Sequence, residues 1–470
     1  MLGRIFSHSL LYAFAPQIPR VVSIFLLPLF TKYLDPIDYG INATITAYTG
    51  ILSGIKDLGI TILLVNAFYH FKDKWKFHWR VLYGYMLMWA PVLFALAFSL
   101  IWIITPPEAE KNRLLVCLLS TLPLLFFEHT IIVGFRYFHL VKRNPVYISI
   151  VSVITGLLTI AINYYVIVIL KQGYMGWLWA TFLGSFVSFL FYLFPVVFRL
   201  KLIPIFYLNS SFFLKKMRVS LPMIPHTYSA YLLNASDRMV MNVLKIDIGR
   251  IGVYNLASTF GSYFEILGNA LGLGIGPFIN DLIDKKTEES ENQLKNLIYF
   301  FQFLFIFGAF LASLWMKEIF GLLISNEELR AGYWMAVIII MGYAYRPMYW
   351  GCVNRLIYYG RTAKLWKISF VAGVLNLLIN FTFIPIFGYK VAIFATFISL
   401  LYIGFSGYFL KEFKSLSKVN YHPVRWILFL ITMSVAVYLL KDIAMYYKII
   451  ITLIVAGIGL KMFLKLKKNI

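Results

Sequence analysis

Long apolar segments recur along the whole chain and constrain its fold more than any other feature. A bilayer core is about 30 Å thick, so a helix needs about 20 apolar residues to cross it. Alternation typical of a membrane barrel is absent, and we therefore expect an all-α integral membrane protein with about fourteen transmembrane helices. The expected helices lie at residues 10–31, 41–69, 81–104, 114–135, 146–170, 175–198, 219–244, 251–280, 297–316, 331–352, 366–387, 390–410, 424–440 and 446–464.

Composition agrees with a membrane protein and excludes several classes of function. Hydrophobic residues make up 61% of the chain and charged residues 13%, against roughly 25% charged residues in a soluble domain. Cys117 and Cys352 each lie in an apolar segment, so neither a disulfide framework nor a paired-cysteine metal motif is expected. No Gly-Lys-Ser/Thr sequence occurs, which excludes a Walker ATPase. No histidine pair has metal-ligand spacing, and we expect no cofactor and no metal.

The basic excess of the chain, a formal charge of +23, follows membrane topology. If both termini are cytoplasmic, the termini and cytoplasmic connections between the expected helices hold 25 of the 43 Lys and Arg, and the opposite connections hold 9. The positive-inside rule favours this orientation in a cytoplasmic (inner) membrane, and nucleic-acid binding is not expected. The longest connection, Arg199 to Arg218, leaves no room for an extramembrane catalytic domain, so the sequence does not predict an enzyme.

Short motifs recur at an offset of just over 200 residues. Gly173-Tyr174 recurs as Gly388-Tyr389 at an offset of 215, and Pro16-Gln17-Ile18-Pro19 recurs as Pro222-Met223-Ile224-Pro225 at an offset of 206. The offset spans six helices, an even number, which relates the two copies by an axis along the membrane normal. The sequence therefore predicts a six-helix lobe at residues 1–205, a second at 206–415, and two accessory helices at 416–470.

The cations that lie well inside predicted helices include Arg20, Lys56, Arg238 and Arg346. A charged side chain costs about 2.5–3.5 kcal/mol at the bilayer centre, so all four are expected to face protein or water. Two interpretations remain open. The cations form ion pairs with Asp57, Glu128, Asp237 and Glu265, or they bind an anionic ligand, since arginine binds phosphate oxygens through its planar fork.

Polar side chains accompany these charges at steps of three and four residues, the spacing of one helix face. One such stripe runs from Asn42 to Lys56, and another from Asn255 to Asn269. Hydrogen bonding between helices is the alternative explanation. We expect a wet, cationic cavity where the lobes meet, lined by Gln17, Arg20, Asn42, Ser53, Lys56, His226, Tyr231, Asn234, Arg238 and Arg346. Candidates for ion coupling are Asp57, Glu128, Asp237 and Glu265.

Two groups of short motifs lie near the start and the middle of the chain. The first comprises Tyr33-Leu34-Asp35-Pro36, Asp38-Tyr39-Gly40 and Leu58-Gly59; the second comprises Leu221-Pro222, Ile224-Pro225-His226, Asp237-Arg238 and Gly252-Val253-Tyr254. In order and spacing they resemble polysaccharide (O-antigen type) repeat-unit flippases of the multidrug/oligosaccharidyl-lipid/polysaccharide exporter superfamily. The resemblance covers essentially the whole chain.

The resemblance implies a flippase that moves an undecaprenyl diphosphate-linked oligosaccharide across the membrane by alternating access, for lipopolysaccharide O-antigen or capsule synthesis. It implies that Arg20, Lys56 and Arg238 bind the diphosphate. The implied partners are this polyprenyl diphosphate-linked oligosaccharide, membrane lipids, and a polysaccharide polymerase or ligase. A peptidoglycan-precursor, teichuronic-acid or multidrug exporter on the same fold is the alternative. A membrane-embedded glycosyltransferase is disfavoured because the chain has no large outer loop.

Overall fold

The computed structural model describes residues 17–71, 73–207, 217, 220, 224–361 and 365–467. All regular secondary structure in these residues is helical, which confirms the predicted fold class. Within them, eight helices are long and apolar enough to cross a membrane, or nine if one bent pair counts as a single span. The chain is a multi-pass membrane protein. The predicted number of fourteen is not reproduced among single helices, because several predicted spans are broken into shorter pieces.

The helices pack into two units. Unit 1 comprises Met1–Tyr228, Asp247–Gly252 and Leu323–Asn326, and unit 2 comprises Ser229–Ile246, Val253–Leu322 and Glu327–Ile470. The helices up to residue 199 are α2 (Ile18–Phe25), α3 (Leu27–Tyr33), α4 (Pro36–Ser53), α5 (Ile60–His70), α6 (Trp75–Ile104), α7 (Arg113–Phe126), α8 (Glu128–Arg136), α9 (Pro145–Asn163) and α10 (Met175–Leu193). Short helical turns join or extend them: η2 (Pro107–Asn112), η3 (Tyr137–Val141), η4 (Tyr164–Ile169) and η5 (Phe194–Arg199).

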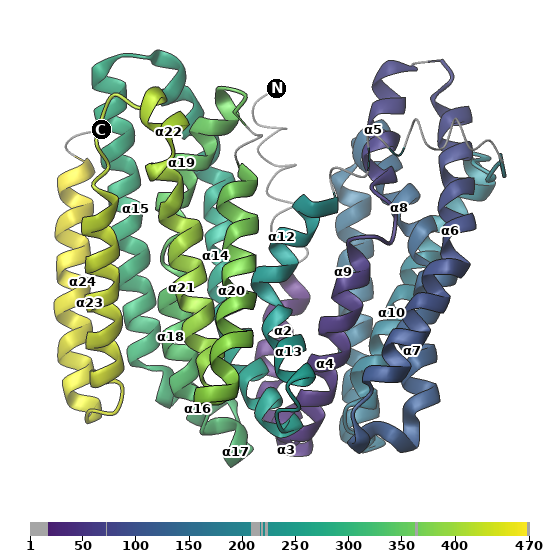
Figure 1. The fold of residues 1–470 in the computed structure, drawn as a ribbon, viewed down its shortest axis with the longest axis horizontal. Coiled ribbons are helices and arrows are strands. Elements are labelled where there is room, and N and C mark those ends of the chain that lie inside the picture. The colour runs from purple at the N-terminus through teal and green to yellow at the C-terminus, as the bar shows by residue number, and fades with distance from the viewer. Residues whose placement is uncertain are drawn as a thin grey trace. The chain divides into compact units, whose positions relative to one another are not determined.

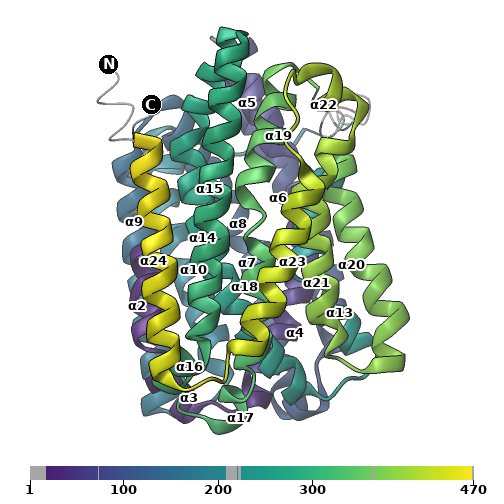
Figure 2. The same ribbon diagram turned by 90° about the vertical axis from the view of Figure 1, so that its left-hand side faces the viewer.

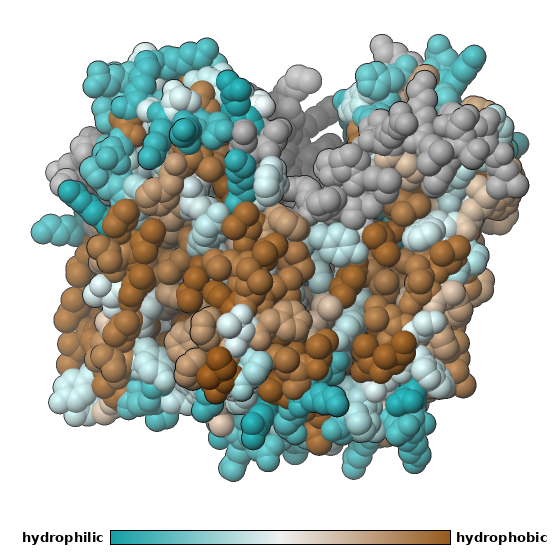
Figure 3. Space-filling model, in the orientation of Figure 1, coloured by the Kyte–Doolittle hydropathy of each residue, from teal (hydrophilic) through white to brown (hydrophobic). Residues whose placement is uncertain are grey.

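The second half of the chain contains more helices and ends in a hairpin (Figures 1 and 2). Its elements are α12 (Ile224–Asn234), α13 (Ser236–Val243), α14 (Ile248–Lys285), α15 (Glu288–Leu314), α16 (Met316–Leu323), α17 (Glu327–Arg330), α18 (Tyr333–Tyr343), α19 (Arg346–Tyr358), α20 (Leu365–Phe387), α21 (Val391–Phe405), η8 (Ser406–Phe409), α22 (Lys411–Leu416), α23 (Pro423–Leu440) and α24 (Met445–Lys467). The hairpin of α23 and α24 packs on α15. In Figure 3, hydrophobic side chains cover the flank of unit 2 and hydrophilic ones cover both of its ends, as in a bilayer-spanning bundle.

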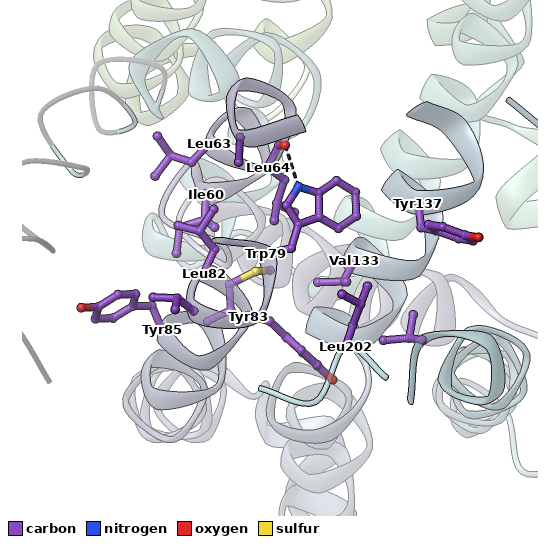
Figure 4. Close-up of a cluster of buried hydrophobic side chains, with 14 of the residues drawn as sticks. Ile60, Leu63, Leu64, Trp79, Leu82, Tyr83, Tyr85, Val133, Tyr137 and Leu202 are labelled. Atoms are coloured by element: carbon purple, nitrogen blue, oxygen red, sulfur yellow. Dashed lines mark hydrogen bonds between the residues drawn. The ribbon is translucent and has the colours of Figure 1, made fainter. Parts of the chain in front are cut away.

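An apolar cluster of unit 1 lies where α5, α6 and α8 meet (Figure 4). Trp79 is fully buried and donates its indole N–H to the carbonyl of Leu64 at 2.8 Å. The hydroxyls of Tyr83 and Thr130 lie 2.6 Å apart. Because buried aromatic groups with polar atoms need such partners, these bonds align three helices around one core.

The helix predicted at residues 41–69 is broken, contrary to the prediction of one continuous span. It divides into α4 and α5, with turns between them in which Leu58 has φ 50° and Gly59 has φ 70°. The Asp57 carboxylate accepts hydrogen bonds from the backbone amides of Gly59 and Thr61, each at 3.2 Å. Asp57 therefore caps the start of α5, where helical amides have no partner within the helix.

Further predicted spans are broken as well: α7 and α8 meet at a 41° bend, α12 and α13 are separated at Ala235, and α18 and α19 are separated at Ala344 and Tyr345. Pro347 explains the last break, since it has no N–H to continue the ladder of α18. Pro28 does the same between α2 and α3. Hydropathy sums do not register such breaks, because the residues on either side remain apolar.

The glycines of the two motif groups bring two helix starts together within unit 1. A Cβ at Gly252 would lie 1.9 Å from the carbonyl oxygen of Pro36, and a Cβ at Gly40 would lie 1.9 Å from that of Ile248. The first turn of α14 thus crosses the first turn of α4 backbone to backbone. Asp38 stabilises the first turn of α4, because it completes a capping box with Asp35. It also accepts a hydrogen bond from the backbone amide of Tyr174 at 2.7 Å.

Candidate functional site

A buried carboxylate opens α13, directly after the break that follows α12. Asp237 is 2% exposed and accepts from the backbone N–H of Arg238 at 2.8 Å and from Arg238 Nη1 at 2.9 Å. The Tyr254 hydroxyl donates to its other oxygen. A buried ionised carboxylate is tolerated only when it is paired and hydrogen-bonded, and these three donors meet that requirement.

The Nε and Nη1 atoms of the Arg238 guanidinium have hydrogen-bond acceptors, whereas Nη2 does not among the described residues. Its Nε donates to Asn255 Oδ1 at 3.3 Å, its Nη1 also donates to the carbonyl of Asn234, and it lies over the Tyr254 ring at 5.2 Å. Among the residues that the structure describes, Nη2 has no acceptor. The side chain is 11% exposed. A fixed guanidinium with one open N–H edge can donate to an anionic oxygen.

A second cation lies at the break between α18 and α19. Arg346 donates from Nη1 to Asn269 Oδ1 at 2.9 Å and from Nη2 to Glu265. Both partners belong to α14. A Cβ at Gly268 would lie 3.1 Å from Arg346 Cγ, so this glycine leaves the space that the arginine fills. Gly272 of α14 likewise leaves room for Trp350, whose Nε1 would lie 2.7 Å from a Cβ there.

Arg238, Asp237 and the Arg346 partner Glu265 line a cavity of about 220 Å³ within unit 2. Its wall includes Asn234, Asp237, Arg238, Glu265 and Tyr343. The Tyr343 hydroxyl donates to Asn234 Oδ1 at 3.5 Å. The cavity therefore combines a guanidinium, two carboxylates and neutral hydrogen-bonding groups, the kind of lining that orients a polar ligand.

A chain of buried polar residues that the sequence did not predict leads to Asp237 in the cavity wall. Asn376 and Asn380 of α20 are fully buried, and Asn380 Nδ2 donates to Asn376 Oδ1 at 3.0 Å. Asn376 also donates to Thr396 Oγ1 at 3.4 Å, and the Thr396 hydroxyl donates to Asp237 at 3.5 Å. Two asparagines one helical turn apart in an apolar segment were the available signal, since a buried amide needs partners.

Unit 1 holds a separate ion pair beside the break between α4 and α5. Lys56 Nζ lies 2.9 Å from Glu128 Oε2, and the two side chains are 30% and 23% exposed. Glu128 is the first residue of α8, so this pair also lies at a helix break. The indole N–H of Trp89 donates to the carbonyl of Ile55 at 2.9 Å, which holds the unwound segment in place.

The remaining predicted residues are not part of either cluster. Arg20 is exposed and donates to Gln17 Oε1 at 3.1 Å, one turn away. Asn42 is half-buried on α4, and the Tyr231 hydroxyl contacts Met239 Sδ at 2.7 Å. The side chains of Ser53 and His226 lie outside the described residues.

Of the two interpretations offered for the intramembrane cations, ion pairing describes three of the four. Lys56, Arg238 and Arg346 pair with Glu128, Asp237 and Glu265. Asp57 caps α5 instead. Paired cations can still take part in binding, because an anionic ligand can replace a carboxylate without leaving the cation unpaired.

Comparisons with known proteins agree with this architecture. The family model described as "Polysaccharide biosynthesis protein" matches residues 9–272. Among solved structures, the lipid II flippase MurJ in an inward closed conformation matches with a TM-score of 0.66 and 15% identity, over 94% of this chain and 100% of that one. An inward-facing multidrug resistance MATE family transporter of the MOP superfamily matches with a TM-score of 0.54 and 13% identity, over 88% and 96%. A comparison with curated proteins gave no match. At these identities, the structural likeness establishes the fold.

Proposed function

Because the chain belongs to the polysaccharide biosynthesis protein family, we propose that it is a flippase for undecaprenyl diphosphate-linked oligosaccharide repeat units. It moves them across the cytoplasmic membrane, with both of its own termini in the cytoplasm, for O-antigen or capsule synthesis. The flippase changes no covalent bond. Its neighbours in the membrane are lipids and the polymerase or ligase that uses the translocated unit.

One observation carries this proposal: Arg238 is fixed at a helix break, beside a polar cavity, with Nη2 unbonded among the described residues. A diphosphate offers several oxygens to such a donor. Non-helical backbone inside a membrane is tolerated where it is buried or lines a water-filled cavity, and transporters use such breaks for substrate sites. Arg238 therefore binds the diphosphate, while Asn234 and Tyr231 contact the sugar side of the ligand.

In the transporter without ligand, the ion pairs neutralise the buried cations. Removing a ligand from an unpaired buried arginine would leave a charge that costs several kcal/mol. Glu265 neutralises Arg346 at that stage, and a phosphate oxygen takes its place during transport. Arg20 and Lys56 receive the diphosphate in unit 1, where Gln17 is a polar neighbour of Arg20. Asn42, Ser53 and His226 remain further candidates for ligand binding.

The membrane potential can drive the step. Two negative charges that move outward across an inside-negative 100 mV gain about 4–5 kcal/mol, at about 2.3 kcal/mol per charge. Of the four acidic candidates for ion coupling, Glu128 and Glu265 are the better placed, since their side chains are 23% and 21% exposed. Asp57 accepts the capping hydrogen bonds of α5, and Asp237 is 2% exposed.

A second candidate is a peptidoglycan-precursor flippase, favoured by the likeness of fold to the lipid II flippase MurJ. Both candidate ligands carry a polyprenyl diphosphate, so the diphosphate site is the same in either case. The sugar portion distinguishes them.

The experiment is translocation by the purified protein in proteoliposomes, with fluorescent undecaprenyl diphosphate-linked oligosaccharide in one arm and lipid II in the other. Arg238→Ala is expected to lower the initial rate by at least tenfold, and Arg238→Lys by less, since lysine keeps the charge and loses the fork. The exposed Arg361→Ala is the matched control.

Removing Arg238 leaves Asp237 buried without its cation, so a fold check is needed. The double variant Asp237→Asn/Arg238→Gln keeps hydrogen-bonding groups and removes both charges. An unchanged rate in this folded double variant contradicts the diphosphate site. Faster transport of lipid II than of the oligosaccharide selects the second candidate.

A further inference from the structure

A second, larger cavity lies at the junction between the last helix of the repeat and the C-terminal hairpin. It has a volume of about 690 Å³ and is formed by η8, α22, the segment Ser417–His422 and the start of α23. We call it the junction pocket and define it by Phe409, Phe413, Lys414, Lys418, His422 and Arg425. In Figures 1 and 2, α22 lies at the end of unit 2 where α23 begins.

The charged or titratable nitrogen-bearing side chains that line the junction pocket are all basic. Lys414, Lys418 and Arg425 are exposed, His422 is the fourth basic residue of the wall, and no lining residue is acidic. Among the described residues, neither Lys414 nor Arg425 forms an ion pair, whereas Lys56, Arg238 and Arg346 each do. Hydrophilic side chains cover this end of unit 2 (Figure 3). Unpaired cations around one hollow attract an anion.

A fully buried arginine holds the backbone next to the wall of the junction pocket. Arg355 pairs with Glu291 through two bonds, Nη1 to Oε1 at 2.8 Å and Nη2 to Oε2 at 2.6 Å. Its Nη1 also donates to the carbonyl of Leu416 at 2.8 Å. Within the wall itself, the backbone amide of His422 donates to Asn420 Oδ1 at 2.8 Å. A pocket held in this way loses little entropy when a ligand enters.

An apolar groove adjoins the junction pocket at Phe409. The groove has a volume of about 400 Å³ and is lined mainly by Leu401, Phe405, Phe409, Leu410 and Ile427, on the contacting helices α21 and α23 and the connection between them. Next to it, Val424 and Leu428 of α23 are 53% and 60% exposed. Phe409 lines both hollows, so a cationic pocket continues into an apolar channel along two membrane-spanning helices.

We propose that the junction pocket and its groove bind an anionic phospholipid. The headgroup phosphate contacts Lys414, Lys418 and Arg425, and one acyl chain lies in the groove between α21 and α23. A small anion uses the cations alone and leaves the groove empty, whereas a phospholipid fills both. Basic pockets between membrane helices bind anionic headgroups in this way. The lipid bridges α21 and α23, and thereby fastens the C-terminal hairpin to the rest of unit 2. This site is independent of the proposed transport function.

The test measures thermal unfolding of the full chain in detergent with added lipid. Phosphatidylglycerol is expected to raise Tm in a concentration-dependent manner, whereas phosphatidylcholine and inorganic phosphate are not. The variant Lys414→Gln/Lys418→Gln/Arg425→Gln should lose about 100-fold in phosphatidylglycerol affinity, about fivefold for each cation removed. The matched control Lys111→Gln/Lys171→Gln/Lys390→Gln removes three exposed lysines elsewhere and should bind like the wild type.

Single variants guard against a triple variant that does not fold, since Lys414→Gln and Arg425→Gln should each weaken binding about fivefold. Ile427→Trp fills the groove, leaves the charge unchanged, and should also weaken phosphatidylglycerol binding. Equal affinity in the triple variant and its control overturns the site. Full stabilisation by inorganic phosphate overturns the lipid as the occupant. Displacement of phosphatidylglycerol by undecaprenyl diphosphate at matched concentration assigns the pocket to the transport substrate and likewise overturns the proposal.

Discussion

Each unit holds an ion pair between two helices that the predicted repeat would match, but the charges are exchanged. In unit 1, the cation Lys56 follows α4, on the second predicted helix, and the anion Glu128 begins α8, on the fourth. In unit 2, the anion Glu265 lies on α14, the eighth predicted helix, and the cation Arg346 begins α19, on the tenth. The predicted repeat would match the second helix with the eighth and the fourth with the tenth. Under that prediction, the repeat keeps the place of an ion pair and not the sign of each partner.

The surroundings of the two pairs differ in a way that sets their energies. Lys56 lies in unwound backbone and is 30% exposed, whereas Glu265 lies in the unbroken helix α14 and its partner Arg346 is 11% exposed. Arg346 also binds Asn269. Exposed pairs contribute little because water screens them, whereas a buried pair that loses one partner leaves a charge in low dielectric. We expect the pair of unit 2 to be the more sensitive to mutation.

Arg346→Met should have the largest effect. It leaves Glu265 without its cation, and the free energy of unfolding is expected to fall by about 3–5 kcal/mol. The charge exchange suggests the matched control: Glu265→Lys/Arg346→Glu gives unit 2 the arrangement of unit 1 and should recover at least half of the loss. Chemical unfolding in detergent measures all three proteins. A double variant as unstable as Arg346→Met would show that the sign of each partner matters in unit 2.

Gly252→Ala comes next and tests the backbone crossing between the first turns of α4 and α14 within unit 1. The new Cβ would lie 1.9 Å from the carbonyl oxygen of Pro36, so the first turns of α4 and α14 must separate. Overpacking of this kind costs about 1–3 kcal/mol. The control is Gly308→Ala, where nothing lies within 4 Å. Equal melting temperatures for the two variants would contradict the close crossing.

Asp57→Ala examines the break that unit 1 has and α14 lacks. The change removes the acceptor for the amides of Gly59 and Thr61, and the loss of such a cap costs about 1 kcal/mol. Asp57→Asn should lose less, because the amide oxygen still accepts. Hydrogen exchange at Thr61 and the following residues gives a local readout. Unchanged protection there would mean that the break does not depend on Asp57.

The smallest effect is expected for the pair of unit 1. Lys56→Met and Glu128→Gln should show a coupling energy of about 0.5–1 kcal/mol in a double-mutant cycle, as is usual for partly exposed pairs. The same cycle at Glu265 and Arg346 supplies the comparison. Coupling in unit 1 as strong as in unit 2 would refute the role assigned to exposure.

Several helices could be read directly from the sequence, whereas others could not. The boundaries of α23, Pro423–Leu440, and of α20, Leu365–Phe387, agree closely with the predicted 424–440 and 366–387. The span predicted at 41–69 failed because the apolar segment was taken to continue through residues 54–59, whereas the Asp57 carboxylate and Gly59 favour a turn. In the candidate site, Arg238, Asp237 and Asn234 were predicted together, but Asn376 and Thr396 were not, since neither lies near a charge in the sequence.

The sequence by itself determined that the chain folds into membrane-spanning helices and that cations must be sheltered within them. Hydropathy is a sum over neighbouring residues, so local composition is sufficient for that conclusion. Only the tertiary structure decided which acid shelters which cation, because Lys56 meets a residue 72 positions away and Arg346 one 81 positions away. It also decided where helices break, since a break depends on capping and packing partners that segment hydropathy does not contain.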